Sequence, residues 1–405
     1  MSELSYLEKL LDGVEVEWRN LGDTSLFEIA NNGRKPVKAS LRIAGETPYY
    51  GANNIQDYVD GYTHDGEYVL IAEDGSASLE NYSIQYATGK FWANNHVHVV
   101  RGKERVHSRF LYHYLCIVNF LPFLTGGGRA KLTKGQLIEI PVPIPCPNNP
   151  EKSLAIQSEI VRILDKFTAL TAELTAELTM RKKQYNYYRD QLLSFDEGEV
   201  EWKTLGAIGK FTYGYAAKAQ ISGDARFVRI TDINTNGKLS PFEPMFVDIS
   251  AENEKYTLKK NDLLMARTGA TFGKTMIFEE DYPAIYAGFL IKLSLDRDII
   301  DPKYYWHFAQ SDYFWEQANK LVSGGGQPQF NANALKQIKV PIPYPNEAGK
   351  SLSEQARIVS VLDKFDILAS SITEGLPREI ELRQKQYEYY RDLLFSFPKP
   401  EIASH

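Results

Sequence analysis

Basic side chains gather in one stretch of the first half of the chain. Residues 100–138 hold seven Arg and Lys residues against a single acid, Glu104, which leaves a local excess of +6. These residues are Arg101, Lys103, Arg105, Arg109, Arg129, Lys131 and Lys134. Lys and Arg side chains bind phosphates, and both can also form hydrogen bonds with the edge of guanine. The stretch therefore predicts a nucleic-acid contact, and the alternative interpretation is a solvated basic face.

A second polar stretch occupies the corresponding part of the second half. Residues 317–346 contain no Asp or Glu. Asn and Gln are the usual partners of adenine. The candidates are Lys320, Gln327, Gln329, Asn331, Asn333 and Lys336. Both stretches include a Gly triplet, and Gly127 in the first would let the backbone approach a sugar-phosphate chain closely.

Further candidates lie outside these two stretches. Arg267, Thr268 and Lys274 flank a Gly-rich turn, and they are predicted to contact DNA in the same way. Asn94 and Asn95 form a polar run that we treat as a weaker candidate for the same contact.

Motifs for catalysis are missing from the sequence. No Pro-Pro dipeptide occurs, so the Asn/Asp-Pro-Pro-aromatic motif of an amino-methyltransferase cannot be present. Neither a Walker A loop nor a dinucleotide-binding glycine spacing is found. His96, His98, His107 and His113 lack a companion acid or Cys in the sequence pattern of a metal site, so we expect no metal. We therefore expect a chain that binds rather than catalyses.

These candidate residues are framed by a sequence that is written twice. Glu15 to Gly22 returns as residues 199–206, and Val142 to Asn148 returns as residues 340–346. Residues 160–167 return as 358–365, and 181–190 return as 383–392. The stretches between the repeats, about 23–138 and 207–336, barely resemble each other. A repeated frame around different contents predicts one scaffold with two specificities, and the alternative is duplication followed by drift.

Long helices are predicted where the frame repeats. Residues 153–195 contain no Gly or Pro, and apolar residues recur there at steps of three and four. A helix of this length needs a helical partner, and the second copy over 351–397 is expected to lie antiparallel to it. Gly375 and Pro377 predict a break in that second helix.

A smaller repeat lies within the first helix. Thr171-Ala-Glu-Leu174 is followed by Thr175-Ala-Glu-Leu178, and the matching part of the second copy has a different length by four residues. Each unit adds roughly 6 Å of helix, nearly one turn. We interpret the doubled unit as a ruler between two readers, and the alternative is an ordinary solvated helix.

Composition limits the partners. The 405 residues carry a net charge of −6 with a pI near 5.8, which is acidic for a protein that holds DNA unaided. Two cysteines, and no signal peptide or apolar run long enough to span a bilayer, predict a cytoplasmic protein without membrane contact.

The repeated frame, the Pro-x-Pro-x-Pro exits and the doubled Thr-Ala-Glu-Leu unit together resemble the DNA-specificity subunit of type I restriction-modification enzymes. The doubled unit is similar to that of the subfamily whose members differ in spacer length through the number of such units. The resemblance implies double-stranded DNA as ligand, two methyltransferase subunits and motor-nuclease subunits as partners. It also implies S-adenosylmethionine, ATP and Mg on those partners and no cofactor on this chain.

The sequence thus predicts an α/β (α+β) protein with two tandem target-recognition domains, separated by long antiparallel coiled-coil helices in a pseudo-twofold repeat. The expected parts are an N-terminal helical segment (1–13), recognition domain 1 (14–150), a central spacer helix (151–197), recognition domain 2 (198–349), a C-terminal spacer helix (350–398) and a tail (399–405). The predicted function is non-catalytic reading of a bipartite, asymmetric DNA target. The alternative function is a two-domain interaction scaffold that binds no nucleic acid.

Overall fold

The chain folds into two compact units. The structure is a computed structural model, and it describes residues 10, 13–126, 130–196, 198, 200–324, 326–371 and 373–397. Unit 1 comprises Met1–Glu173 with Glu381–His405, and unit 2 comprises Leu174–Ile380. In the described residues no helix has both the length and the apolar character needed to cross a membrane. Most of the predicted N-terminal segment and the tail lie outside the described residues.

Unit 1 is built on a four-stranded antiparallel sheet. Its strand order is β2 (Phe27–Ile29), β9 (Val97–Gly102), β6 (Tyr68–Ala72) and β7 (Ile84–Ala87). All five residues of β6 are buried, as expected of a central strand covered on both faces. The helix α2 (Ser108–Leu115) packs on this sheet, and the short helix α3 (Lys134–Leu137) lies at the end of the basic stretch.

A second sheet in unit 1 carries the rest of the first insert. Its order is β4 (Ile55–Val59), β3 (Ala44–Tyr50), β8 (Lys90–Ala93) and β5 (His64–Asp65).

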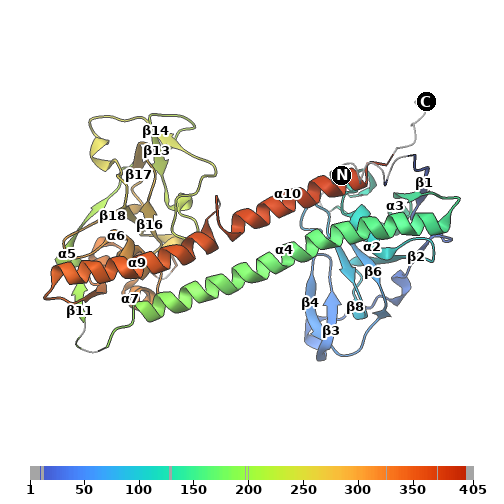
Figure 1. The fold of residues 1–405 in the computed structure, drawn as a ribbon, viewed down its shortest axis with the longest axis horizontal. Helices are drawn as coiled ribbons and strands as arrows, with labels where there is room; N and C mark the ends of the chain where they lie inside the picture. The colour runs from blue at the N-terminus through green and yellow to red at the C-terminus, as the bar shows by residue number, and fades with distance from the viewer. Residues whose placement is uncertain are drawn as a thin grey trace. The chain divides into compact units, whose positions relative to one another are not determined.

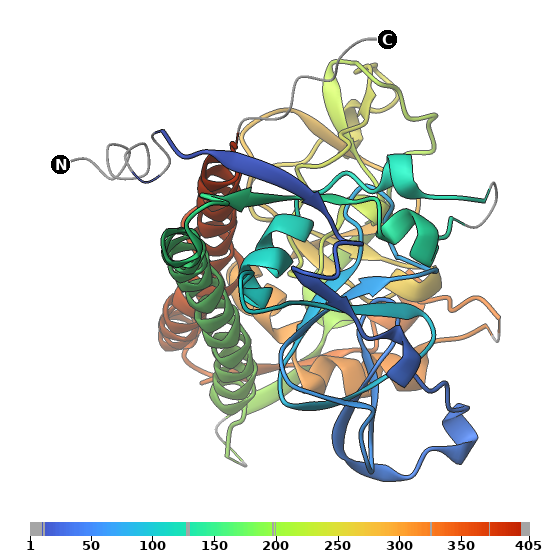
Figure 2. The same ribbon diagram turned by 90° about the vertical axis from the view of Figure 1, so that its right-hand side faces the viewer.

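The repeated frame closes each insert with a two-stranded ribbon. In unit 1, β1 (Val16–Asn20) pairs with β10 (Pro141–Pro145), and the two strands lie side by side in Figure 2. The Gly22 N–H then donates to the Ile138 carbonyl at 2.9 Å. A Cβ on Gly22 would meet the Ile138 Cβ at 3.0 Å, so this close approach explains the glycine. The two ends of the insert therefore meet at one point.

Unit 2 repeats the frame and the main sheet of unit 1, but its second sheet has three strands in place of four. Its main sheet has the order β12 (Gly209–Tyr213), β18 (Leu290–Leu295), β15 (Asp262–Ala266) and β16 (Thr275–Phe278). The ribbon pairs β11 (Val200–Thr204) with β19 (Lys339–Pro343). The second sheet has only β14 (Phe246–Val247), β13 (Ala225–Val228) and β17 (Ala284–Tyr286), and one of its pairings is parallel.

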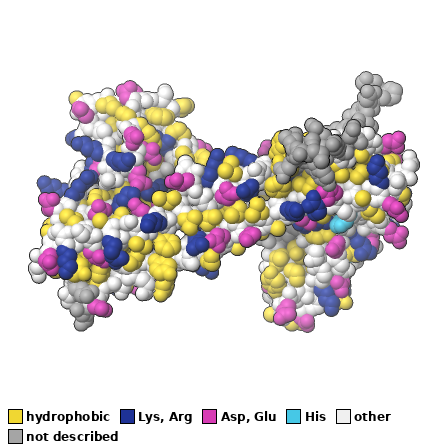
Figure 3. Space-filling view, in the orientation of Figure 1, with side chains coloured by type: hydrophobic (Ala, Val, Ile, Leu, Met, Phe, Trp, Pro, Cys, Tyr) yellow, Lys and Arg dark blue, Asp and Glu magenta, His cyan; other side chains and the backbone are white. Residues whose placement is uncertain are grey.

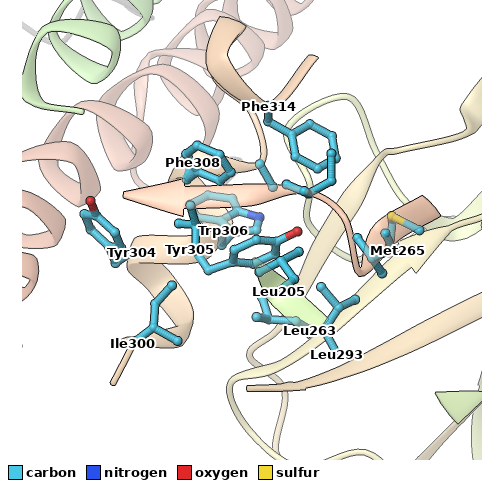
Figure 4. Packing of buried hydrophobic residues seen from close by; sticks show 14 of the residues in the cluster. Leu205, Leu263, Met265, Leu293, Ile300, Tyr304, Tyr305, Trp306, Phe308 and Phe314 are labelled. Atoms are coloured by element: carbon cyan, nitrogen blue, oxygen red, sulfur yellow. The ribbon is translucent and has the colours of Figure 1, made fainter. Parts of the chain in front are cut away.

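Short helices complete unit 2. They are α5 (Leu205–Ile208), α6 (Pro302–Phe308), α7 (Asp312–Leu321) and α8 (Ala332–Leu335). Figure 4 shows the aromatic side chains Trp306, Phe308 and Phe314 packed together in the core with Leu263 and Leu293 of the sheet. Each of these five side chains is buried. This core gives unit 2 its own hydrophobic interior, separate from the clusters of unit 1.

Long helices form the C-terminal part of each repeat (Figure 1). The first is α4 (Pro150–Leu192), and the second copy is divided into α9 (Ala348–Ser370) and α10 (Leu376–Leu394). The predicted break at Gly375 and Pro377 is confirmed. Unlike the prediction, α4 ends at Leu192, where the Leu193 and Ser194 N–H groups close the last turn.

The helices run antiparallel, as expected. Within unit 1, Phe167 of α4 stacks on Tyr390 of α10 at 5.3 Å between ring centroids. Within unit 2, Tyr188 of α4 stacks on Phe365 of α9 at 5.3 Å. As the residue number rises along α4, the partner's number falls, which defines the antiparallel direction. The doubled unit from Thr171 to Leu178 lies inside α4, and the boundary between the two compact units falls within it.

Candidate nucleic-acid interface

Three of the predicted cations in unit 1 already have carboxylate partners. Arg101 on β9 pairs with Glu28 of β2 at 2.6 Å. Lys131 pairs with Glu73 at 3.0 Å. Arg109 on α2 faces α4 and bonds the Asp165 carboxylate at 2.8 Å. The local excess of positive charge is therefore smaller than the sequence indicated, because these acids are distant in sequence and close in space.

The remaining described cations of this cluster are more available. The side chains of Lys103 and Arg105 donate to the backbone carbonyls of Thr24 and Pro147, which leaves their charge without a carboxylate. Lys134 begins α3 and is exposed. Arg129 and Gly127 lie outside the described residues. Lys103, Arg105 and Lys134 are thus the described positions that best suit phosphate contacts.

Asn94 and the four histidines are occupied by structural contacts. Asn94 is buried, and its side chain accepts from the His96 N–H at 2.8 Å, whereas Asn95 is exposed. Asn94 is therefore less accessible than Asn95 in this conformation, and the DNA contact predicted for both residues stays a prediction. His98 contacts the Leu132 carbonyl and the Asn31 amide, and His107 caps α2. Among the described residues, no group of three or more His, Cys, Asp or Glu could hold a metal ion.

In unit 2 the fold brings together two candidate segments that are far apart in sequence. Thr268 forms an isolated bridge with Gln329, and the Gly269 N–H donates to the Pro328 carbonyl at 3.0 Å. The Phe330 N–H donates to the Arg267 carbonyl at 2.8 Å. The Gly-rich loop before Gln329 therefore lies against the end of β15.

Unit 1 has the same arrangement at the equivalent positions. Asp74 bridges with Lys131, and Thr125 bridges with Lys131, just as Ser323 bridges with Gln329 in unit 2. Both units therefore place the segment that follows the Gly triplet beside the end of the central strand, β6 or β15. The two segments share a position but carry different side chains.

The remaining candidates of unit 2 are exposed or partly exposed. Asn331 is exposed and caps α8, because its side-chain oxygen accepts from the Asn333 and Ala334 N–H groups. Gln327, Asn333 and Lys336 are exposed, as is Lys320 in the last turn of α7. Lys274 is partly exposed and lines a hollow with Lys182 and Arg189 of α4. Figure 3 shows that acidic and basic side chains are interspersed on the face it presents, without one large basic field.

A buried polar cluster that sequence reasoning missed joins each insert to the long helices. In unit 1, His113 of α2 contacts the Asp165 carboxylate at 2.7 Å and the Tyr387 hydroxyl at 3.3 Å. In unit 2, His307 of α6 contacts Asp363 at 2.9 Å and Tyr185 at 2.8 Å.

The frame repeats contained the signal for these clusters. Both aspartates precede Lys-Phe in the repeated Leu-Asp-Lys-Phe block, and both tyrosines follow Gln in the repeated Gln-Tyr block. The histidines lie in the inserts, within aromatic-His-aromatic segments outside the repeated blocks. Burial lowers the pKa of His113 to about 4 and lowers that of His307, against the opposing effect of each aspartate.

The fold and the candidate residues together define a class of protein. It has two α/β units with the same repeated frame and long antiparallel helices. Each unit has different side chains beside the end of its central strand, β6 or β15. Comparison with known proteins identifies a family with this organisation. The family model described as "Type I restriction modification DNA specificity domain" matches residues 14–180 and 198–382.

Similar proteins carry the same assignment. A Haemophilus influenzae protein assigned as a type I restriction enzyme specificity subunit is 48% identical, covering 97% of this chain and 98% of that protein. The Escherichia coli EcoR124I/EcoR124II specificity subunit is 39% identical over the full length of both chains. The S subunit of a type I restriction-modification system from M. genitalium has the same fold, with a TM-score of 0.60 and 16% identity over 96% of this chain and 98% of that one.

The chain therefore belongs to the family of type I restriction-modification DNA specificity subunits. The predicted family and fold class are confirmed. The specificity subunit is a non-catalytic component of such systems, as the sequence predicted. Neither the individual DNA-contacting residues nor the domain limits are tested by these comparisons, so they stay predictions.

Proposed function

We propose that this specificity subunit reads a split, asymmetric duplex sequence, with one half-site contacted by each unit. The observation that carries the proposal is the matched placement of two different segments, each following a Gly triplet in the sequence, bridged at Lys131 in unit 1 and at Gln329 in unit 2. A common frame fixes where each segment lies, while unlike side chains on it would select unlike bases. An asymmetric target follows from two readers that differ.

Within each unit, we assign phosphate contacts to exposed cations and base contacts to the loop and the strand end beside it. Lys103, Arg105 and Lys134 would anchor unit 1, and Lys320 and Lys336 would anchor unit 2. Gln327 and Arg267 would face base edges, because an amide and a guanidinium can each make two hydrogen bonds to one base. Arg101, Arg109 and Lys131 would contribute only if they exchanged their present carboxylate partners.

The long helices would hold two methyltransferase subunits. Tyr187 in unit 2 and Tyr389 in unit 1 occupy the same position of the repeat, and their rings are 61% and 54% exposed. Exposed aromatic residues of this kind are typical anchors of protein interfaces. Two equivalent anchors favour two equivalent docking positions. Motor-nuclease subunits would join the same complex, with S-adenosylmethionine, ATP and Mg bound by the partners and not by this chain.

Salt dependence of duplex binding tests the DNA-reading proposal. The complex of this chain with its methyltransferase partners should bind its target duplex with an affinity that falls steeply between about 50 and 200 mM salt, because phosphate contacts release counterions. The matched comparison is the methyltransferase alone under the same conditions. If the complex bound no more tightly than the methyltransferase alone, the scaffold alternative without nucleic acid would replace the proposal.

A further inference from the structure

Arg267 of unit 2 has a fixed guanidinium without a carboxylate partner among the described residues. It follows β15 directly, and its N–H and carbonyl are held by Phe289 and Phe330. Its Nε donates to the Gly288 carbonyl at 3.2 Å. The guanidinium carbon lies 5.1 Å from the Tyr213 ring centroid and 5.6 Å from that of Phe289. The backbone and Nε of Arg267 are therefore both held by hydrogen bonds, and its guanidinium lies against two rings.

Arg267 and the two rings beside it are not buried. Phe289 is 57% exposed, and Tyr213 is partly exposed while its hydroxyl accepts from the Ala332 N–H at 3.1 Å. Arg267, Gly214, Tyr215 and Gly288 line one hollow of unit 2. No described acid lines this hollow, and Arg229, which also lines it, is paired with Asp232 at 2.8 Å. The two terminal nitrogens of Arg267 thus remain as donors toward the hollow.

The equivalent residue of unit 1 has the opposite charge. Glu73 follows β6 as Arg267 follows β15, and the Leu132 N–H donates to its carbonyl as the Phe330 N–H does to that of Arg267. Glu73 is paired with Arg34 at 2.6 Å and with Lys131 at 3.0 Å. At the same point of the scaffold, one unit has a neutralised acid and the other has an unpaired arginine. This position therefore distinguishes the two readers.

We propose that Arg267 is a specificity-determining residue that reads one guanine in the half-site of unit 2. This inference rests on the proposed function. A planar guanidinium with two parallel donors matches the O6 and N7 acceptors of guanine in the major groove. A phosphate anchor needs charge but no particular orientation, whereas the two flanking rings and the Gly288 carbonyl restrict the guanidinium of Arg267. The geometry accordingly favours a base edge over a phosphate.

The test uses the complete complex with its methyltransferase partners and its mapped target. Each guanine of the unit 2 half-site is replaced in turn by 7-deazaguanine, which pairs normally but lacks the N7 acceptor. One such replacement should weaken binding by the wild-type complex on the order of tenfold and should not weaken binding by R267A further. R267A itself should lose roughly 5- to 150-fold on the natural duplex.

Two variants separate base reading from charge and from folding. R267K keeps the charge without the planar fork, so it should retain the salt dependence yet lose discrimination at that guanine. R297A removes an exposed arginine from the loop after β18 and should behave as the wild type. Complex assembly by each variant is verified by mass measurement.

Three results would overturn the assignment. One is a unit 2 half-site without guanine. Another is an R267A complex that binds all duplexes equally weakly, with a flatter salt dependence and an undiminished 7-deazaguanine effect, since Arg267 would then be a phosphate anchor. The third is a wild-type complex with no salt-dependent duplex binding, which alone would also refute the proposed function.

Discussion

The paired His–Asp–Tyr clusters explain at residue scale why parts of the frame are repeated. The contacts of His113 and His307 fit a neutral ring whose Nε2–H donates to the aspartate and whose Nδ1 accepts from the tyrosine hydroxyl. A cation occupies the same place beside each aspartate, Arg109 in unit 1 and Lys303 in unit 2. Each cluster ties the insert's helix to two long helices, so exchange of any member would leave a buried polar group without its partner.

These histidines predict a loss of stability in mild acid. Burial lowers the pKa of His113 to about 4 and also lowers that of His307. The unfolded chain then binds protons below about pH 6.5 that the folded chain excludes, so stability is complete above that pH and falls toward pH 4. For His113 the loss by pH 4 is on the order of 3 kcal/mol.

Urea unfolding measured from about pH 7.5 to 4.5 checks this prediction, because the histidines of the unfolded chain take up protons within this window. Glu73 and Asp363 have lowered pKa values, since cationic and hydrogen-bonding partners outweigh burial, and they lose their contribution only below about pH 4.5. H113Q should reduce the pH dependence, and H113Q with H307Q should reduce it further. An unchanged dependence in the double variant would show that these residues do not cause it.

At the scale of elements, the sequence predicted the features that depend on residues close together in the chain. The length of α4, the break at Gly375 and Pro377 and the extended Pro-rich exits follow from helix propensity and proline geometry. The two ends of each insert also meet close to where the repeats stop, at Gly22 and Ile138 in unit 1. Strand order could not be predicted, because it depends on pairings between residues such as Phe27 and Gly102 that are distant in sequence. The carboxylate partners of Arg101, Arg109 and Lys131 could not be predicted for the same reason, because they too are distant in sequence.

One element, α4, gives a direct test of the ruler. Insertion of one further Thr-Ala-Glu-Leu unit after Leu178 should leave both half-site sequences unchanged and lengthen the unread spacer between them. Four residues add roughly 6 Å and rotate the downstream part of the helix by only about 40°, so packing on the partner helix survives. Because α9 ends at Ser370 and α10 begins at Leu376, the partner copy is not one continuous helix and can accommodate the extra length.

Mapping of methylated sites measures the outcome of this insertion. An increase of one base pair, or two, is expected, given about 3.4 Å of rise per base pair. As the matched control, insertion of two residues rotates the downstream helix by about 200° and should abolish methylation. A four-residue insertion that changed the recognised bases while the spacer stayed fixed would contradict the ruler.

At the scale of the whole molecule, duplication predicts two partners for each chain. Y187A and Y389A should each weaken the docking of one methyltransferase, because each tyrosine presents an exposed ring at the same repeat position of a different unit. Native mass measurement of the purified complexes should find two partners on the wild type and fewer on each variant under dilution, with the double variant losing both. Y82F, which removes a hydroxyl from inside unit 1, is the matched control and should keep both partners. A wild-type complex with one partner per chain would refute the two-site model.

The duplicated architecture also predicts that the two readers are separable. The ends of the first insert meet where Gly22 bonds Ile138, and those of the second meet where the Gly206 N–H donates to the Lys336 carbonyl at 3.0 Å. Replacement of residues 23–138 with the insert of another family member therefore exchanges the first insert and leaves the repeated ribbon and long helices in place. Retaining Arg109 and His113, or their equivalents, preserves the bonds to Asp165 on α4.

The exchanged protein should methylate a hybrid target in which one half-site is new, while the other half-site and the spacer length are those of the wild type. The reciprocal exchange of residues 207–336 should change only the other half-site. This exchange also replaces Arg267, which lies within the second insert. Sequencing of modified sites in cells that carry each hybrid measures both halves at once. If a single exchange altered both halves together, the bases would be selected jointly by the two inserts, and the independence implied by their separate hydrophobic cores would not extend to recognition.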